Sequence, residues 1–143
     1  MKVVFDTNII IDHLKGLPEA REQLRNIENG VFEGFVSTIT VMELLSAPRI
    51  SEQRYEAIRN LLEAFEHIPV DKKVATIAGK LLSTYRASHG MDPLDALIAA
   101  TALVNEAVLF TLNKKHFRFI EGLVSMNPYL DGSVCFSFFS SNP

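Results

Sequence analysis

Short apolar runs alternate with helix-patterned segments along most of this chain. The first run, Lys2 to Asp6, is continuous, β-branched and aromatic, which is typical of a strand buried on both faces. The other runs that predict strands are Phe35 to Ser37, His67 to Val70, Ala107 to Thr111 and Leu123 to Met126. This order predicts an α/β fold, a three-layer α/β/α sandwich with a central parallel sheet of four or five strands.

The segments between these runs carry apolar residues at helical spacing. The expected helices span residues 8–14, 18–29, 40–48, 51–66, 71–90 and 92–105, and a turn with a short helix spans 113–120. Pro18 and Pro93 suit a first helical turn, whereas Gly30 and Gly90 suit helix ends. The helix boundaries are therefore marked by residue type as well as by periodicity.

Composition narrows the class of protein. The 143 residues suit one domain, and a hydrophobic content of 48% is enough to build a full core. The single cysteine, Cys135, excludes an internal disulfide and a thiolate zinc cage, which fits a reducing cytoplasm. No apolar run reaches the roughly 20 residues of a membrane span. A net charge of −3 argues against a general basic coat for nucleic acid.

Three acids stand where a strand, or the turn after it, gives way to a helix. Asp6 closes the first strand, Glu43 follows the second, and Asp95 opens an Ala-rich helix. In a parallel α/β sheet such junctions meet at one edge, where ligands bind. Gathered carboxylates repel one another unless a cation joins them, and Mg²⁺ or Mn²⁺ prefers oxygen ligands. The pattern predicts a metal-dependent enzyme that acts on phosphate esters.

Each acid also has a simpler interpretation as a helix cap. Thr40 and Glu43 have the spacing of a capping box, Asp92 suits the cap of the helix that contains Asp95, and Asp6 can cap the helix after it. The joint pattern favours a metal site, because caps need not follow buried strands. The alanines after Asp95 would also let that helix approach the sheet closely, beside the end of the first strand.

Four segments follow one another along the chain in the order of a known family pattern. They are residues 5–10 (FDTNII), 37–44 (STITVMEL), 95–103 (DALIAATAL) and 111–117 (TLNKKHF). Together they resemble PIN-domain ribonucleases, and most closely the VapC-like toxins of toxin–antitoxin pairs. The resemblance covers residues 1–129. Residues 130–143 form a C-terminal extension of unknown role, which could add an edge strand, make a dimer or antitoxin contact, or cover the core.

The resemblance implies a PIN-like sandwich with Mg²⁺- or Mn²⁺-dependent endoribonuclease activity on RNA, a cognate antitoxin protein as partner, and a homodimer. It also assigns residues. Asp6, Glu43 and Asp95 would be catalytic and bind the metal, with Asn113 as a further catalytic position. Asn8 and Thr111 would support the site by orienting the first acid or the metal waters.

Asn113 departs from the family pattern. Many members carry a fourth acid at this position, and an asparagine supplies an oxygen but no charge. The pocket should then bind cations more weakly, and a second metal becomes doubtful. A catalytically degenerate PIN domain that acts as a protein- or RNA-binding module is therefore the main alternative. A phosphoaspartate protein, either a receiver domain or a haloacid-dehalogenase-like phosphatase, ranks lower. Such a phosphatase needs a second Asp two residues after the first, where this chain has Asn8.

A basic segment follows the last predicted site residue. Lys114, Lys115 and His116, with Arg118, are interleaved with Phe117 and Phe119. They form either a basic, partly aromatic lip for single-stranded RNA or a solvated face with both phenylalanines in the core. His116 is interpreted as a phosphate, packing or surface residue, not as a general base. Arg49 is a weaker candidate for a phosphate contact.

Overall fold

The computed structural model describes residues 1–130 and contains a five-stranded parallel sheet. The strands are β1 (Lys2–Phe5), β2 (Glu33–Ser37), β3 (Glu66–Ile68), β4 (Val108–Phe110) and β5 (Ser125–Met126), in the spatial order β3-β2-β1-β4-β5. β1 is therefore central, and the predicted parallel α/β sheet is confirmed. The C-terminal extension predicted at residues 130–143 lies outside the described residues from residue 131 onward.

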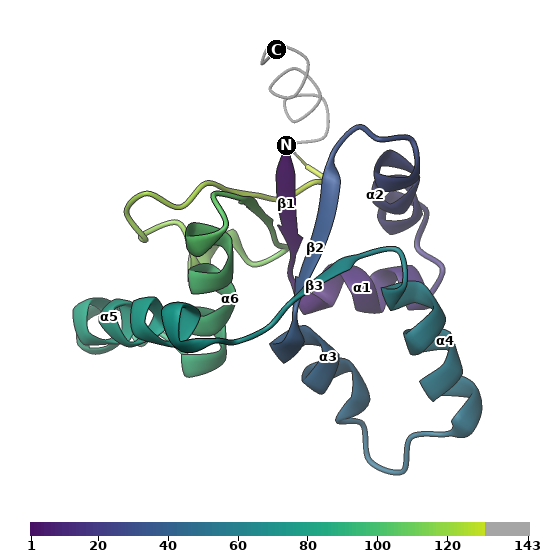
Figure 1. Cartoon of the computed structure of the whole chain (residues 1–143), viewed down its shortest axis with the longest axis horizontal. Helices are drawn as coiled ribbons and strands as arrows, with labels where there is room; N and C mark the ends of the chain where they lie inside the picture. Colours follow the sequence, from purple (N-terminus) through teal and green to yellow (C-terminus); the bar gives the residue numbers. More distant parts are fainter. Residues whose placement is uncertain (131–143) are drawn as a thin grey trace.

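Six α-helices connect these strands (Figure 1). They are α1 (Thr7–Leu14), α2 (Pro18–Glu28), α3 (Thr38–Leu45), α4 (Glu52–Leu62), α5 (Lys72–His89) and α6 (Pro93–Val104), and the short 3₁₀ helix η1 spans Lys114–His116. The expected helix 51–66 ends earlier, at Leu62, because Glu66 already pairs with Phe35 in the sheet. Among the described helices, none has both the length and the apolar character needed to cross a membrane.

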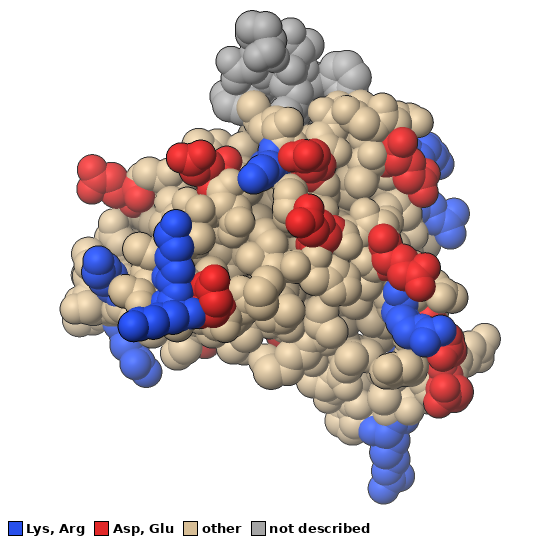
Figure 2. All heavy atoms as spheres, in the orientation of Figure 1, with Lys and Arg blue, Asp and Glu red and all other residues tan. Residues whose placement is uncertain are grey.

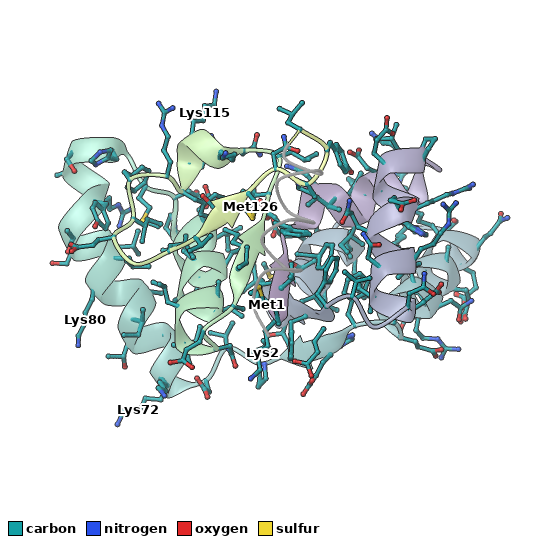
Figure 3. The ribbon with its side chains drawn as sticks, turned by 90° about the horizontal axis from the view of Figure 1, so that it is seen from above. Met1, Lys2, Lys72, Lys80, Lys115 and Met126 are labelled. Atoms are coloured by element: carbon teal, nitrogen blue, oxygen red, sulfur yellow. The ribbon has the colours of Figure 1, made fainter. Side chains whose placement is uncertain are left out.

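The sheet separates two hydrophobic cores. Val3 and Phe5 face the core that α1, α2 and α4 cover, whereas Val4 faces the core beneath α5 and α6. Figures 1 and 3 show these helix layers on opposite sides of the sheet. Because successive side chains of a strand point to opposite faces, a central strand covered on both sides must be apolar at every position. This explains the uninterrupted run at the start of the chain.

The Ala-rich helix α6 lies close against the sheet, as its sequence predicted. Ala96, Ala99, Ala100 and Ala102 are completely buried. Small side chains allow the backbone of a helix to approach its neighbours closely. The first turn of α6, which carries Asp95, is thereby brought toward the end of β1.

The strand register sets the edge at which the site forms. Phe5 of β1 pairs with Phe110 of β4, so Asp6 and Thr111 both follow at the same carboxyl edge of the sheet. The backbone N–H of Asp6 continues this ladder by donating to the Phe110 carbonyl at 2.9 Å. Ser37 ends β2 at this edge and caps α3, since its hydroxyl accepts from the Ile39 N–H.

Candidate active site

Asp6 lies at the N-terminus of α1 and is only 8% exposed. Its Oδ1 accepts a 2.9 Å hydrogen bond from the Thr7 N–H, so Asp6 does cap α1. Its Oδ2 accepts a 2.8 Å hydrogen bond from the Thr111 hydroxyl. Burial raises the pKa of Asp6, while these two donors and the nearby His116 act in the opposite direction. The carboxylate is thus held in one orientation by groups from two parts of the chain.

Thr111 is itself held in place by the turn that follows it. The backbone N–H of Asn113 donates to the Thr111 hydroxyl oxygen at 3.0 Å. A hydroxyl group has one hydrogen, and an ionised carboxylate can only accept, so the hydrogen of Thr111 points to Asp6. The position of Asn113 therefore affects Asp6 through its backbone, whatever its side chain does.

Asp95 stands beside Asp6, in the first turn of α6. Burial raises the pKa of Asp95, and the charge of Asp6 raises it further. His116 opposes this effect, because its Nδ1 lies 3.2 Å from Oδ2 of Asp95. Asp92 caps α6 through bonds from the Leu94 and Asp95 N–H groups, as the sequence predicted. The two acids, distant in sequence, therefore share one electrostatic environment.

Glu43 reaches the site through Thr7. Its Oε1 accepts a 2.8 Å hydrogen bond from the Thr7 hydroxyl, which also lies 3.1 Å from the Thr40 hydroxyl. Since Glu43 only accepts and Thr7 has one hydroxyl hydrogen, Thr40 must be the donor to Thr7. The capping-box interpretation of Thr40 and Glu43 is wrong, because α3 starts earlier and Ser37 is its cap.

Sequence reasoning missed Thr7 and Thr40. Both are buried, and their hydroxyls tie α1 to α3 beneath Glu43. The available signal for Thr7 was its place directly after Asp6, at a strand-to-helix junction. A threonine at such a junction is also a common capping residue, so the pattern alone did not separate the two roles.

Asn8, a predicted supporting residue, and Arg49, a predicted phosphate contact, are not brought to this cluster by any hydrogen bond within residues 1–130. Asn8 is exposed on α1, one residue past Thr7, and its side chain bonds to no other part of the described chain. Arg49 lies in the exposed turn after α3 with a φ of 52°, and it forms no ion pair there. The expected role of Asn8 toward the metal waters and that of Arg49 toward a phosphate stay predictions.

Of the two interpretations of the basic segment after Asn113, the structure agrees better with a solvated face than with an aromatic lip. Phe117 is completely buried, so its part of that hypothesis is wrong. Phe119 packs against Tyr85 and His89 instead of projecting freely. Lys114, Lys115 and Arg118 are exposed. On the face drawn in Figure 2, Lys and Arg side chains are scattered among Asp and Glu, as the net charge suggests.

The donor set suits a hard divalent cation, although no ready-made cage exists. Within residues 1–130, no three Asp, Glu, His or Cys side chains already converge on a metal position. Asp6 and Asp95 supply carboxylate oxygens whose repulsion a cation would relieve, and Glu43 is one hydrogen bond from the residue after Asp6. These residues fit Mg²⁺ or Mn²⁺ by chemistry, and the Thr7 hydroxyl engages only one of the two carboxylate oxygens of Glu43.

Comparison with known families fits this geometry. The model of the PIN domain family matches residues 3–122, which include Asp6, Glu43, Asp95 and Thr111. The chain belongs to the PIN-domain family. It is 41% identical over 118 residues to Ribonuclease VapC19 of Mycobacterium tuberculosis, covering 82% of this chain and 92% of that one. Ribonuclease VapC10 of the same organism is 35% identical over 123 residues, covering 85% and 90%.

Solved structures also share the fold of this chain. VapBC2 from Rickettsia felis, bound to a DNA fragment from its promoter, matches with a TM-score of 0.77 and 26% identity, covering 88% of this chain and 98% of that chain. A toxin–antitoxin complex from Klebsiella pneumoniae matches with a TM-score of 0.70 and 31% identity, covering 89% and 98%. The PIN-like sandwich expected from the sequence is thus confirmed.

Proposed function

We propose that this PIN-domain protein is a metal-dependent endoribonuclease and the toxin of a toxin–antitoxin pair. The observation that supports it most is the pairing of Asp6 and Asp95 at the carboxyl edge of the sheet, where the charge of one raises the pKa of the other. The ribonuclease names of relatives up to 41% identical point to RNA as the substrate.

The acids have separable roles in this proposal. Asp6, Asp95 and Glu43 would hold Mg²⁺ or Mn²⁺, and the bound ion would lower the pKa of a water and offset charge on the phosphate. Thr111 keeps the Asp6 carboxylate aimed at the site, and Thr7 limits where Glu43 can reach. Asn113 offers a neutral oxygen where many family members have a charge, so tight binding of a second ion is not expected.

A catalytically degenerate binding module is the competing hypothesis, and one experiment separates the two. Purified protein is incubated with defined single-stranded and structured RNAs in Mg²⁺ or Mn²⁺, beside Asp6→Asn and a Glu63→Gln control at the exposed residue directly after α4. We expect cleavage that needs the metal, survives in Glu63→Gln and disappears in Asp6→Asn. RNA binding without cleavage, equal in wild type and Asp6→Asn, would support the binding module instead.

We further propose a cognate antitoxin as the partner, with a homodimer as the free form in the cytoplasm. The support is that the matched solved structures are described as VapBC or toxin–antitoxin complexes. The test is co-expression with the small reading frame next to this gene. Co-purification of the two proteins in a fixed ratio, with RNA cleavage suppressed, supports the proposal. A monomer that does not bind the protein encoded by the neighbouring reading frame contradicts it.

A further inference from the structure

A small cleft of about 160 Å³ opens beside Asp95. The end of α5, the start of α6 and the segment around η1 form its walls, which include His89, Met91, Lys115 and Phe119. It also shares His116 with the candidate active site. A group bound in this cleft would therefore lie directly next to whatever Asp95 helps to bind.

The size and lining of the cleft suit a single flat ring. Pockets for whole small-molecule ligands are usually larger, from about 300 Å³ upward. The buried Met91 and the half-buried Phe119 supply apolar surface, and Lys115 and Asp92 supply polar groups at the exposed side. A nucleobase has this combination of apolar faces and a polar rim.

His89 offers a stacking surface in the cleft. Its ring lies parallel to Phe119, with 4.2 Å between centroids and 18° between planes. Tyr85 supports Phe119 from α5 at 5.1 Å, and the Ser88 hydroxyl lies 2.7 Å from Nδ1 of His89. Tyr85 also contacts the His89 ring edge-on, with 5.8 Å between centroids, yet His89 remains exposed, so part of its ring can be reached by a ligand. Single-stranded nucleic acids are commonly bound by such stacking on fixed aromatic rings.

The charges around the cleft suit a nucleotide within a strand. Figure 3 shows Lys115 projecting outward, on the opposite side of the view from Lys72 and Lys80. Its ammonium group can form an ion pair with a backbone phosphate at the mouth of the cleft. Oδ2 of Asp92 is used in capping α6, which leaves Oδ1 to accept from a base. The N–H of uracil lies between two carbonyl oxygens that repel a carboxylate, so Asp92 favours a base with an exocyclic amino group.

We propose that this cleft binds one nucleobase of the RNA, in the nucleotide adjacent to the phosphate that is cut. The proposal rests on the ribonuclease function proposed above and adds the residues that choose the base. His89 stacks on the base, Lys115 binds the strand, and Asp92 selects an amino-bearing base. None of these three would take part in the cleavage step itself.

The first test combines His89→Ala with RNAs that lack one base. His67→Ala, at an exposed histidine on β3, is the matched control. We expect His89→Ala to raise KM about tenfold with little change in kcat, and an abasic nucleotide at one position beside the cut to do the same. The two changes together should cost no more than either alone. Additive effects, or a KM that His67→Ala raises equally, would overturn the proposal while leaving the ribonuclease function intact.

The second test does not need cleavage. The chain has no tryptophan, so His89→Trp places a single fluorescent reporter in the cleft. We expect AMP, GMP and CMP to quench this fluorescence more strongly than UMP, and ribose 5-phosphate to leave it unchanged. Equal quenching by ribose 5-phosphate would refute a base site. Selective quenching by a protein that cuts no RNA would instead refute the proposed ribonuclease function alone.

Discussion

The hydroxyl of Thr111 donates a 2.8 Å hydrogen bond to Asp6 across 105 positions of sequence. This bond joins the ends of β1 and β4, and it fixes the most buried acid of the site. Its geometry depends on both strands stopping in register, which the pairing of Phe5 with Phe110 ensures. The contribution of this hydrogen bond to RNA cleavage can therefore be tested without changing any acid of the site.

Thr111→Val keeps the shape of the side chain and removes this donor. We expect RNA cleavage to fall by about 10- to 100-fold, because partners that orient metal ligands have effects of this size. The Mg²⁺ concentration for half-maximal activity should rise as well. Thr101→Val is the control, since the Thr101 hydroxyl is buried but bonds to Leu97 of its own helix. Equal losses in both variants would indicate a general packing effect.

Thr7 provides a test of how Glu43 is held. Thr7→Val removes the hydroxyl between Glu43 and Thr40, whereas Thr7→Ser retains it. We expect cleavage to drop by roughly tenfold in the valine variant and to recover most of its rate in the serine variant. Steady-state rates on one RNA substrate, with circular dichroism to check folding, would measure this. Similar rates in the two variants would remove Thr7 from the site.

The raised pKa values of Asp6 and Asp95 predict a pH dependence for the metal-free protein. A pKa that is higher in the folded state stabilises folding below the ordinary value of 3.8, and this contribution disappears as the pH rises through the raised value. In EDTA, Asp6→Asn should therefore be more stable than wild type at neutral pH and lose this advantage in acid.

Thermal unfolding with and without Mg²⁺ completes that measurement. A bound ion stabilises the folded state by mass action, so Mg²⁺ should raise the Tm of wild type at neutral pH. Asp6→Asn should respond much less, because it lacks one carboxylate. A metal-free Asp6→Asn protein that melts below wild type at neutral pH would contradict the argument.

Gly34 in β2 predicts a stability effect away from the site. A Cβ added there would lie 2.5 Å from Cδ1 of Ile27 and 3.2 Å from Cδ1 of Phe65. We expect Gly34→Ala to lower the free energy of unfolding by about 1–3 kcal/mol through overpacking. Gly79→Ala, on an exposed and unobstructed position of α5, should instead raise it by about 0.5–1 kcal/mol. Urea unfolding of both variants measures the difference, which would vanish if β2 and α2 can separate freely.

Much of the fold was predictable because local signals agree with the tertiary structure. β1 has to be apolar throughout since it is covered on both faces, and Gly90 ends α5 in the left-handed conformation expected of a helix-ending glycine. The apolar pattern of residues 51–66 predicts an end of α4 that is too far along the chain, because Phe65 is buried in the core without being helical. Periodicity records burial, and a turn that buries a phenylalanine continues the same pattern.

The sequence predicts the acids of the site better than it predicts the residues that hold those acids in place. Strand-to-helix junctions marked Asp6 and Asp95, whereas the bond from Thr7 to Glu43 depends on how α1 packs against α3. The contact between His116 and Asp95 likewise joins η1 to α6. Contacts of this kind between two separate elements produce no periodic pattern that a single sequence would show. Only the resemblance to a family pointed to Thr111, and it pointed equally to Asn8, whose side chain is exposed and forms no hydrogen bond within residues 1–130.

The central position of β1 also has a consequence for how this protein is made. Because a ribosome makes the chain from its N-terminus, Asp6 is synthesised before Asp95 and before the Thr111 that holds it in place. The carboxyl edge of the sheet therefore stays incomplete until β4 and Thr111 have been synthesised and paired with β1. A nuclease with this topology gains its full set of site residues only when its central strand has neighbours from both halves of the chain.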